Sequence, residues 1–235
     1  MPARVSTDDA VLERVDGRSG ELVLRRRGGH LEVILNGAFL ISTENDASSR
    51  AMVSAARPHV AGGALDVLIG GLGLGYALDE ALSWPRVAHV TVAEFEPTIV
   101  RWYREHGGQR AARAAAAEAA GRAVIELADV ADVLRARPAS YDLVSLDTDN
   151  GPEWLVREEN AGLYSAAGAR LVSGALRPGG VAVFWSPDTY PAFEQLLSAV
   201  FARVTVEGAE DVVGGRHHDY AMYVCRTGAA ARGVD

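Results

Sequence analysis

The sequence of 235 residues lacks several features that would assign it to whole classes of protein. Cys225 is the only cysteine, which excludes an intrachain disulfide, and its strand-like surroundings YAMYVCR indicate a buried, inert thiol. No apolar run reaches the roughly 18 residues that a membrane-spanning helix needs. The first segment, MPARVSTDDAVLERVDG, lacks the basic start and apolar middle of a secretory signal. We therefore expect a cytoplasmic protein without a membrane partner.

Positive charge is also scarce. Lysine and arginine total 23 against 31 aspartates and glutamates, which gives a formal net charge of -8. This balance repels phosphate backbones, and no basic stripe with interleaved aromatic residues offsets it. The basic run at residues 25–27 is most simply a solvated strand end. We expect no nucleic-acid partner, and a small substrate that is neutral or bears an amine.

What the sequence does contain is an alternation of strand-like and helix-like segments. Residues 21–43 are typical of a small β meander, and residues 45–57, closed by Pro58, of a linking helix. From residue 64 onward, buried strands alternate with helices, which predicts a parallel sheet covered on both faces. The last two strands are joined by too short a link for a crossover, so the final strand must run antiparallel.

These patterns predict an α/β fold with a Rossmann-like, doubly wound sheet and a small N-terminal β meander. We expect residues 1–57 to hold the meander and linking helix, and residues 58–235 to form the Rossmann-like domain. The alanine-rich segment 110–122 is interpreted as an added helical turn or a flexible surface insert.

A glycine-rich loop follows the first buried strand. The stretch VLIGGLGLGY places Gly71, Gly73 and Gly75 at alternate positions before a predicted helix. Glycines there let the backbone approach a ligand and present the amide end of the helix to it. The GxGxxG register of dinucleotide sites fails, because Tyr76 or Leu78 stands where its third glycine would be. The observed GxGxG is the spacing of S-adenosylmethionine sites, although a tight structural turn is the alternative.

Acidic side chains stand at the ends of the following strands. HVTVAEFEP ends in Glu94 and Glu96, at the usual interval at which a carboxylate accepts both ribose hydroxyls, and Glu94 is the better candidate. Asp129 follows the third strand and could accept from an adenine amino group, cap the next helix, or do both. Asp147 and Asp149 follow the fourth strand, at a strand end where an acid can meet the reacting group. The alternative is that they cap the turn at residues 150–152.

Aromatic and histidine residues offer weaker signals. Tyr76, Trp154 and Trp185 could wall a pocket through stacking or cation–π contact, although core packing is preferred for Trp185. His217 and His218 point to opposite faces of an extended chain, which is poor geometry for one ion. We expect both histidines on an exposed hairpin, with a substrate lid as the alternative, and we predict no metal site.

Five segments resemble the spermidine synthase family of class I S-adenosylmethionine-type folds. They occur in the order VLIGGLGLGY, VTVAEFEP, ELADVADVL, YDLVSLDTDNGP and ALRPGGVAVFWS, after a meander that ends ILNGAFLIST. The resemblance covers about residues 21–187. It implies a seven-stranded nucleoside-binding sheet, a small N-terminal β domain and often a homodimer. It also implies that Glu94 holds the ribose, that Asp129 holds the adenine, and that Asp147 orients or deprotonates an attacking amine.

The sequence departs from this family where a polyamine would bind. The family carries an aspartate, at the position of Gly73, that engages the primary amine of decarboxylated S-adenosylmethionine. Leu40 stands in place of a glutamine, and ASSR at Ala47–Arg50 in place of a tyrosine, a histidine and a glutamate. A multiply charged cation needs several spaced carboxylates. The loss of an acid beside the donor's arm also suits intact S-adenosylmethionine, whose arm ends in a carboxylate.

We therefore expect an S-adenosylmethionine-dependent transferase, and favour a methyltransferase or other alkyl transferase acting on a small nucleophile. Direct displacement would depend on proximity and orientation, with Asp147 and perhaps Asp149 accepting a proton. One alternative is a polyamine aminopropyltransferase that uses decarboxylated S-adenosylmethionine. Another is a noncatalytic module that binds a nucleoside and dimerises.

Overall fold

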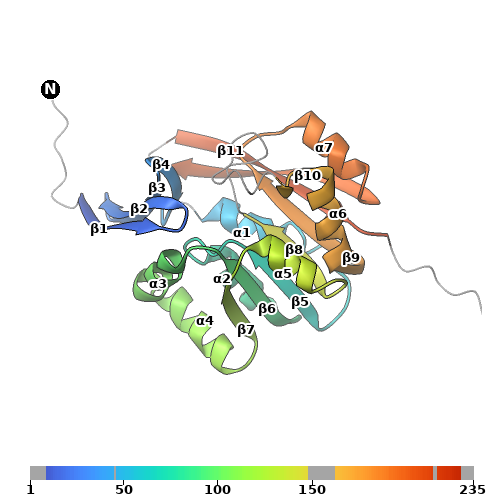
Figure 1. Ribbon diagram of the computed structural model, residues 1–235, viewed down its shortest axis with the longest axis horizontal. Helices are drawn as coiled ribbons and strands as arrows, with labels where there is room; N and C mark the ends of the chain where they lie inside the picture. The colour runs from blue at the N-terminus through green and yellow to red at the C-terminus, as the bar shows by residue number, and fades with distance from the viewer. Residues whose placement is uncertain (1–8, 45, 148–161, 214–215, 229–235) are drawn as a thin grey trace, which may run out of the picture.

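The computed structural model describes residues 9–44, 46–147, 162–213 and 216–228, which form two sheets (Figure 1). The smaller sheet is antiparallel and contains β1 (Ala10–Gly17), β2 (Gly20–Arg27), β3 (His30–Leu35) and β4 (Ala38–Ser42). The larger sheet has seven strands, in the spatial order β10 (Arg203–Val213), β11 (Arg216–Arg226), β9 (Leu176–Ser186), β8 (Tyr141–Leu146), β5 (Leu65–Gly70), β6 (Val87–Glu94) and β7 (Ala123–Leu127).

The strand order of the large sheet confirms the predicted α/β fold. β5 pairs in parallel with both β6 and β8, and β11 is antiparallel to both β9 and β10. The chain runs outward from β5 to β7 and then returns to the other side of β5 with β8, so the order reverses between β5 and β8. Ligands of open α/β sheets bind at such a reversal, beyond the carboxyl ends of the strands.

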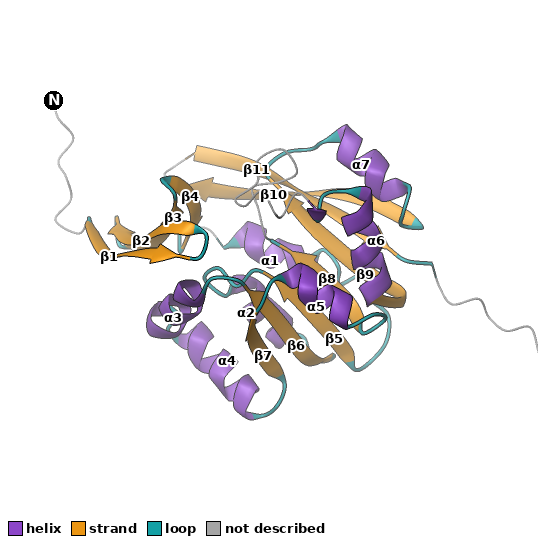
Figure 2. Ribbon diagram, viewed as in Figure 1, coloured by secondary structure: helices purple, strands orange, loops and turns teal. Residues whose placement is uncertain are grey.

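Helices cover both faces of the large sheet (Figure 2). One face carries α1 (Ala47–Ser54), α2 (Tyr76–Ser83), α3 (Pro97–His106) and α4 (Gln109–Ala119), and the other carries α5 (Val130–Ala136), α6 (Ala166–Ala175) and α7 (Pro191–Ser198). Along β5, Val67 and Ile69 join the hydrophobic cluster of the first face, and Leu68 joins that of the second. Successive strand side chains point to opposite faces, so a strand covered on both faces reads as a continuous apolar run.

The small sheet packs beside the carboxyl end of β6 and against α3. Leu22, Leu24 and Val33 belong to the same hydrophobic cluster as the residues of α1 to α4. The core is therefore continuous across the predicted boundary at residue 57, and the division into two domains stays a prediction.

Two elements differ from the sequence-based expectation. The meander has a fourth strand, β1, whose side chains are mostly exposed, so the apolar alternation that would reveal a strand is weak. The alanine-rich segment forms the regular helix α4, which buries Ala114 and Ala117. No helix within the described residues has the length and apolarity needed to span a membrane.

Candidate functional site

The loop between β5 and α2 brings two strand ends together. Gly71 has a φ of +92°, which favours glycine, and a side chain there would collide with the carbonyl oxygen of Asp147. The backbone N–H of Asp147 donates a hydrogen bond of 2.9 Å to the carbonyl oxygen of Gly70. The bare backbone at Gly71 thus allows Asp147, at the end of β8, to lie directly beside the loop.

The other two glycines of the loop serve different contacts. Gly75, with a φ of +79°, precedes α2, and a side chain there would collide with the ring of Tyr103 in α3. Gly73 has a φ of +51°, and a Cβ there would lie 3.1 Å from the Cδ1 atom of Ile41 in β4. Gly75 therefore permits helix packing, whereas Gly73 adjoins the small sheet.

Glu94 is a buried carboxylate at the end of β6. Its Oε2 accepts a 2.8 Å hydrogen bond from the backbone N–H of Leu72 in the glycine loop, and its Oε1 accepts one of 2.8 Å from the N–H of Glu96. Burial raises the pKa of Glu94, against the effect of these backbone donors. A carboxylate has about four acceptor positions, so Glu94 retains capacity for a further donor.

Glu96, the second acid of this strand end, is used within the structure. Its carboxylate accepts hydrogen bonds from the backbone N–H groups of Arg18, at 3.0 Å, and Ser19, in the turn between β1 and β2. Glu96 is buried and thus connects the small sheet to the end of β6. The role of Glu94 as the residue that binds a ligand stays a prediction.

The remaining candidate acids follow β7 and β8. Asp129 caps α5, because its Oδ1 accepts a hydrogen bond of 2.8 Å from the N–H of Ala131, and a contact with adenine would be additional. Asp147 lies beside Gly71, as described above. Asp149 and Trp154 lie outside the described residues. The loop glycines, Glu94, Asp129 and Asp147 thus all lie at the carboxyl edge of the sheet.

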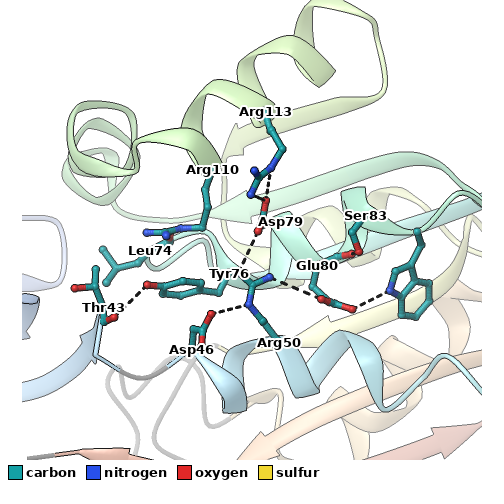
Figure 3. A network of polar contacts seen from close by, with 11 residues as sticks. Thr43, Asp46, Arg50, Leu74, Tyr76, Asp79, Glu80, Ser83, Arg110 and Arg113 are labelled. Carbon is teal, nitrogen blue, oxygen red and sulfur yellow. Dashed lines mark hydrogen bonds and ion pairs between the residues drawn. The ribbon is translucent and has the colours of Figure 1, made fainter.

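A network of charged side chains lies on the other side of the loop, between α1, α2 and α4 (Figure 3). The carboxylate of Asp79 accepts hydrogen bonds from Arg50, at 3.1 Å, and from the Nε of Arg113, at 2.8 Å. Arg50 also donates to Asp46 at 2.7 Å. This network was not predicted from the sequence. The spacing of Asp46 and Arg50, four residues apart at the start of a predicted helix, was a signal for one of its pairs.

Tyr76 is a member of the same network, and its role as a pocket wall stays a prediction. The guanidinium carbons of Arg110 and Arg50 lie 4.1 and 5.4 Å from the centre of its ring. Its hydroxyl donates a long hydrogen bond of 3.5 Å to the carbonyl oxygen of Thr43 (Figure 3). The Nε of Arg110 donates to the carbonyl oxygen of Leu74 at 3.2 Å. Tyr76 is buried, so these contacts fix the first turn of α2 against α1 and α4.

The other aromatic, histidine and cysteine residues named in the sequence analysis contact neighbouring side chains or are buried in the core. Trp185 is partly buried and contacts Tyr220 in a tilted arrangement, with ring centres 5.2 Å apart. His217 is exposed and hydrogen-bonds Glu210, and His218 is exposed and stacks with Tyr220. The described residues contain no group of three or more His, Cys, Asp or Glu suited to a metal ion. Cys225 is buried, and burial raises the pKa of its thiol.

Known proteins resemble this chain in sequence and in fold. No family model matches the chain. It is 29% identical over 186 residues to polyamine aminopropyltransferases of Mycobacterium tuberculosis and Mycobacterium bovis. The match covers 77% of this chain but 34% of theirs, so the chain spans about a third of the length of these relatives.

The solved structures with this fold include spermidine synthases. The spermidine synthase of Thermotoga maritima superposes with a TM-score of 0.74 at 16% identity, covering 93% of this chain and 72% of that one. A spermidine synthase in complex with the transition-state analogue AdoDATO gives a TM-score of 0.73 at 16% identity, with the same coverage. These likenesses confirm the resemblance to the spermidine synthase family and the class I fold with seven strands.

The comparisons also correct the functional expectation. The prediction of a methyltransferase is wrong, because the relatives named above are aminopropyltransferases and spermidine synthases. That prediction depended on the family's polar side chains that are missing at Gly73, Leu40 and Ala47–Arg50. A missing side chain removes one contact, but it does not specify which group is transferred. The alternative, aminopropyl transfer, is the one that the comparisons favour.

Proposed function

We propose that this chain, whose sequence and fold resemble the spermidine synthase family, transfers an aminopropyl group from decarboxylated S-adenosylmethionine to a small amine. The observation that carries the proposal is the close approach of Asp147 to Gly71 at the point where strand order reverses. An acidic residue thus stands beside a glycine loop, whose bare backbone leaves room for a ligand. A homodimer, implied by the resemblance, stays a prediction.

The residues present fit a nucleoside. The Glu94 carboxyl group is buried and held by two backbone N–H groups, and it would accept the ribose hydroxyls. Asp129 would meet the adenine while it caps α5. The loop from Gly71 to Gly75 would present bare backbone to the sulfur-bearing arm. When bound, the sulfonium donor supplies a carbon that is open to displacement.

Asp147 would act on the attacking amine. An ammonium group has no lone pair, so its proton must leave before nitrogen can attack. A carboxylate at the sheet edge would hold the ammonium, orient it and take this proton, a contribution typical of general bases of about 10²- to 10⁴-fold in rate. The position of Asp147 is fixed by its backbone hydrogen bond to Gly70 and by its contact with Gly71.

The proposal is tested with the purified chain, a diamine such as 1,4-diaminobutane, and either decarboxylated or intact S-adenosylmethionine. We expect 5′-methylthioadenosine and an aminopropylated amine from the decarboxylated donor. Substitution of Asp147→Asn should lower turnover by about 10²- to 10⁴-fold. The dissociation constant of 5′-methylthioadenosine, measured by calorimetry, should stay unchanged because the nucleoside contacts are intact.

A matched control is Asp142→Asn, on the same strand but far from its carboxyl end, where Asp142 pairs with Arg177. Turnover per folded molecule should be unchanged in this variant. Products formed only from intact S-adenosylmethionine would contradict the proposal. Binding of 5′-methylthioadenosine without turnover on any amine would instead favour the noncatalytic module.

A further inference from the structure

Two acidic side chains hold the small sheet on the large one. The first is Glu13 of β1, whose carboxylate accepts hydrogen bonds from Arg101, at 2.6 and 2.9 Å, and from the indole N–H of Trp102, at 2.7 Å. The second is Glu96, which accepts from the backbone of Arg18 and Ser19. Both contacts join the small sheet to the region of β6 and α3, so they serve the same docking at two points.

The contact at Glu96 is closely packed. A Cβ on Gly17 would lie 2.7 Å from the Oε2 of Glu96, so the turn can rest on the carboxylate because position 17 has no side chain. The guanidinium of Arg18 lies 5.5 Å from the ring centre of Phe95, and its Nη1 donates to the Phe95 carbonyl oxygen at 3.2 Å. The turn between β1 and β2 is thus fitted to residues 94–96.

Only the second contact is continuous with the candidate ribose site. The backbone N–H of Glu96 donates to the Oε1 of Glu94, and the Oε2 of Glu94 accepts from the N–H of Leu72. A chain of hydrogen bonds therefore runs from the glycine loop through Glu94 and Glu96 to the turn of the small sheet. Glu13 accepts its hydrogen bonds instead from side chains of α3, and none of the bonds found among the described residues joins it to Glu94.

We propose that Glu96 is a positioning residue that couples docking of the β1–β2 turn to nucleoside binding at Glu94. The inference rests on the proposed function, because it assumes that Glu94 binds the ribose. Glu96 donates its N–H to Glu94 and accepts the turn with its carboxylate, so orientation fixed at one end constrains the other. When the turn is docked, its N–H groups also satisfy a negative charge that otherwise repels the neighbouring carboxylate of Glu94.

Coupling between two sites is reciprocal, so nucleoside binding must strengthen docking of the turn by the same factor. Amide hydrogen exchange measures this directly, with 5′-methylthioadenosine as the probe. We expect exchange at Arg18 and Ser19 to slow by about 5-fold or more when the probe saturates the chain. The control amide is Gly28, in the turn between β2 and β3, which donates to Asp9 at 3.0 Å and should not respond.

Variants separate the coupling from docking in general. Glu96→Gln keeps the backbone bond to Glu94 but provides only one acceptor for two N–H groups, and Gly17→Ala pushes the turn off Glu96 without changing either glutamate. Both should weaken binding of 5′-methylthioadenosine by about 5-fold or more. The matched control, Glu13→Gln, loosens the same sheet and lowers the thermal midpoint, but it should leave the dissociation constant unchanged.

Equal weakening of binding by all three variants, or by none, would overturn the inference, as would unchanged exchange at Arg18 and Ser19. These outcomes leave the proposed function intact, because the wild-type chain still binds the nucleoside. A wild-type chain that binds no nucleoside would contradict the proposed function, and the coupling with it.

Discussion

Acidic side chains on the two sides of the glycine loop have different kinds of hydrogen-bond donor. At the carboxyl edge of the sheet, Glu94 and Asp129 accept hydrogen bonds from neutral backbone N–H groups. On the other side, Asp79 lies between the guanidinium groups of Arg50 and Arg113 (Figure 3). An ion pair neutralises both members, whereas a carboxylate bonded to backbone amides keeps its charge and spare acceptor positions. A high density of charge therefore does not by itself mark the ligand site.

The largest expected effect separates the two regions at Glu94. Glu94→Gln should weaken binding of 5′-methylthioadenosine by about 10- to 100-fold, because hydrogen bonds to a charged acceptor contribute about 1.5 to 3 kcal/mol. The new amide has one acceptor oxygen, and its NH₂ group must face one of the two backbone donors, Leu72 or Glu96. Calorimetry measures the change. Wild-type affinity in this variant would place the ribose elsewhere.

The pH dependence of binding provides a second measurement on the same residue. Because burial raises the pKa of Glu94, the carboxylate is protonated at a higher pH than an ordinary glutamate. Affinity for the nucleoside should thus fall as the pH is lowered through this raised pKa. The sign for stability is opposite: the contribution of Glu94 is fully present below the ordinary carboxyl pKa and is lost as the pH rises through the raised one. Both dependences should disappear in Glu94→Gln.

A smaller effect is expected at Asp79, and on stability rather than on binding. Asp79→Asn should lower the free energy of unfolding by about 1 to 2 kcal/mol, because Arg50 and Arg113 are 31% and 55% exposed and water screens the lost charge. Urea denaturation measures this, and nucleoside affinity should not change. The control is Asp132→Asn, which removes an exposed pair with Arg135 and should have little effect. Weaker nucleoside binding in Asp79→Asn would remove the distinction between the two regions.

The fold could be predicted from the sequence where local signals agree. Pro97 opens α3, Asp129 caps α5, and the apolar run at residues 67–69 of β5 identifies a strand covered on both faces. β1 was missed because its side chains are mostly exposed, so its sequence has little apolar alternation. Topology then brings the strand-end acids to one edge, which is why those candidates could be named in advance.

Apart from the pair of Asp46 and Arg50, the network and the docking contact could not be predicted, because their partners are distant in sequence. Arg50 and Asp79 are 29 residues apart, and Ser19 and Glu96 are 77 apart. Nothing in the local pattern around any of them indicates the partner. The same reason explains why Glu96 resembled a second ribose ligand in the sequence, since its use by the small sheet depends on the tertiary fold.

The smallest expected effect is a gain in affinity. It tests whether a new acid in the loop would bind a ligand at the carboxyl edge of the sheet or pair with the arginines on the other side. Gly73 has a φ of +51°, in the left-handed region that aspartate and asparagine tolerate best after glycine, and its Cβ would meet only the flexible end of Ile41. By the family resemblance, an acid at this position engages the primary amine of the decarboxylated donor. Gly73→Asp should therefore fold and bind decarboxylated S-adenosylmethionine several-fold more tightly relative to 5′-methylthioadenosine, which has no amine.

Gly73→Asn is the matched control for this gain, because it has the same size and backbone demand but no charge. Calorimetry with both ligands gives, for each variant, the dissociation constant of 5′-methylthioadenosine divided by that of decarboxylated S-adenosylmethionine. An equal ratio in the two variants would mean that the donor's amine lies away from position 73. A higher ratio in Gly73→Asp alone would show that a carboxylate in this loop attracts a ligand instead of an arginine of the chain, because Arg50 and Arg113 are already engaged by Asp79.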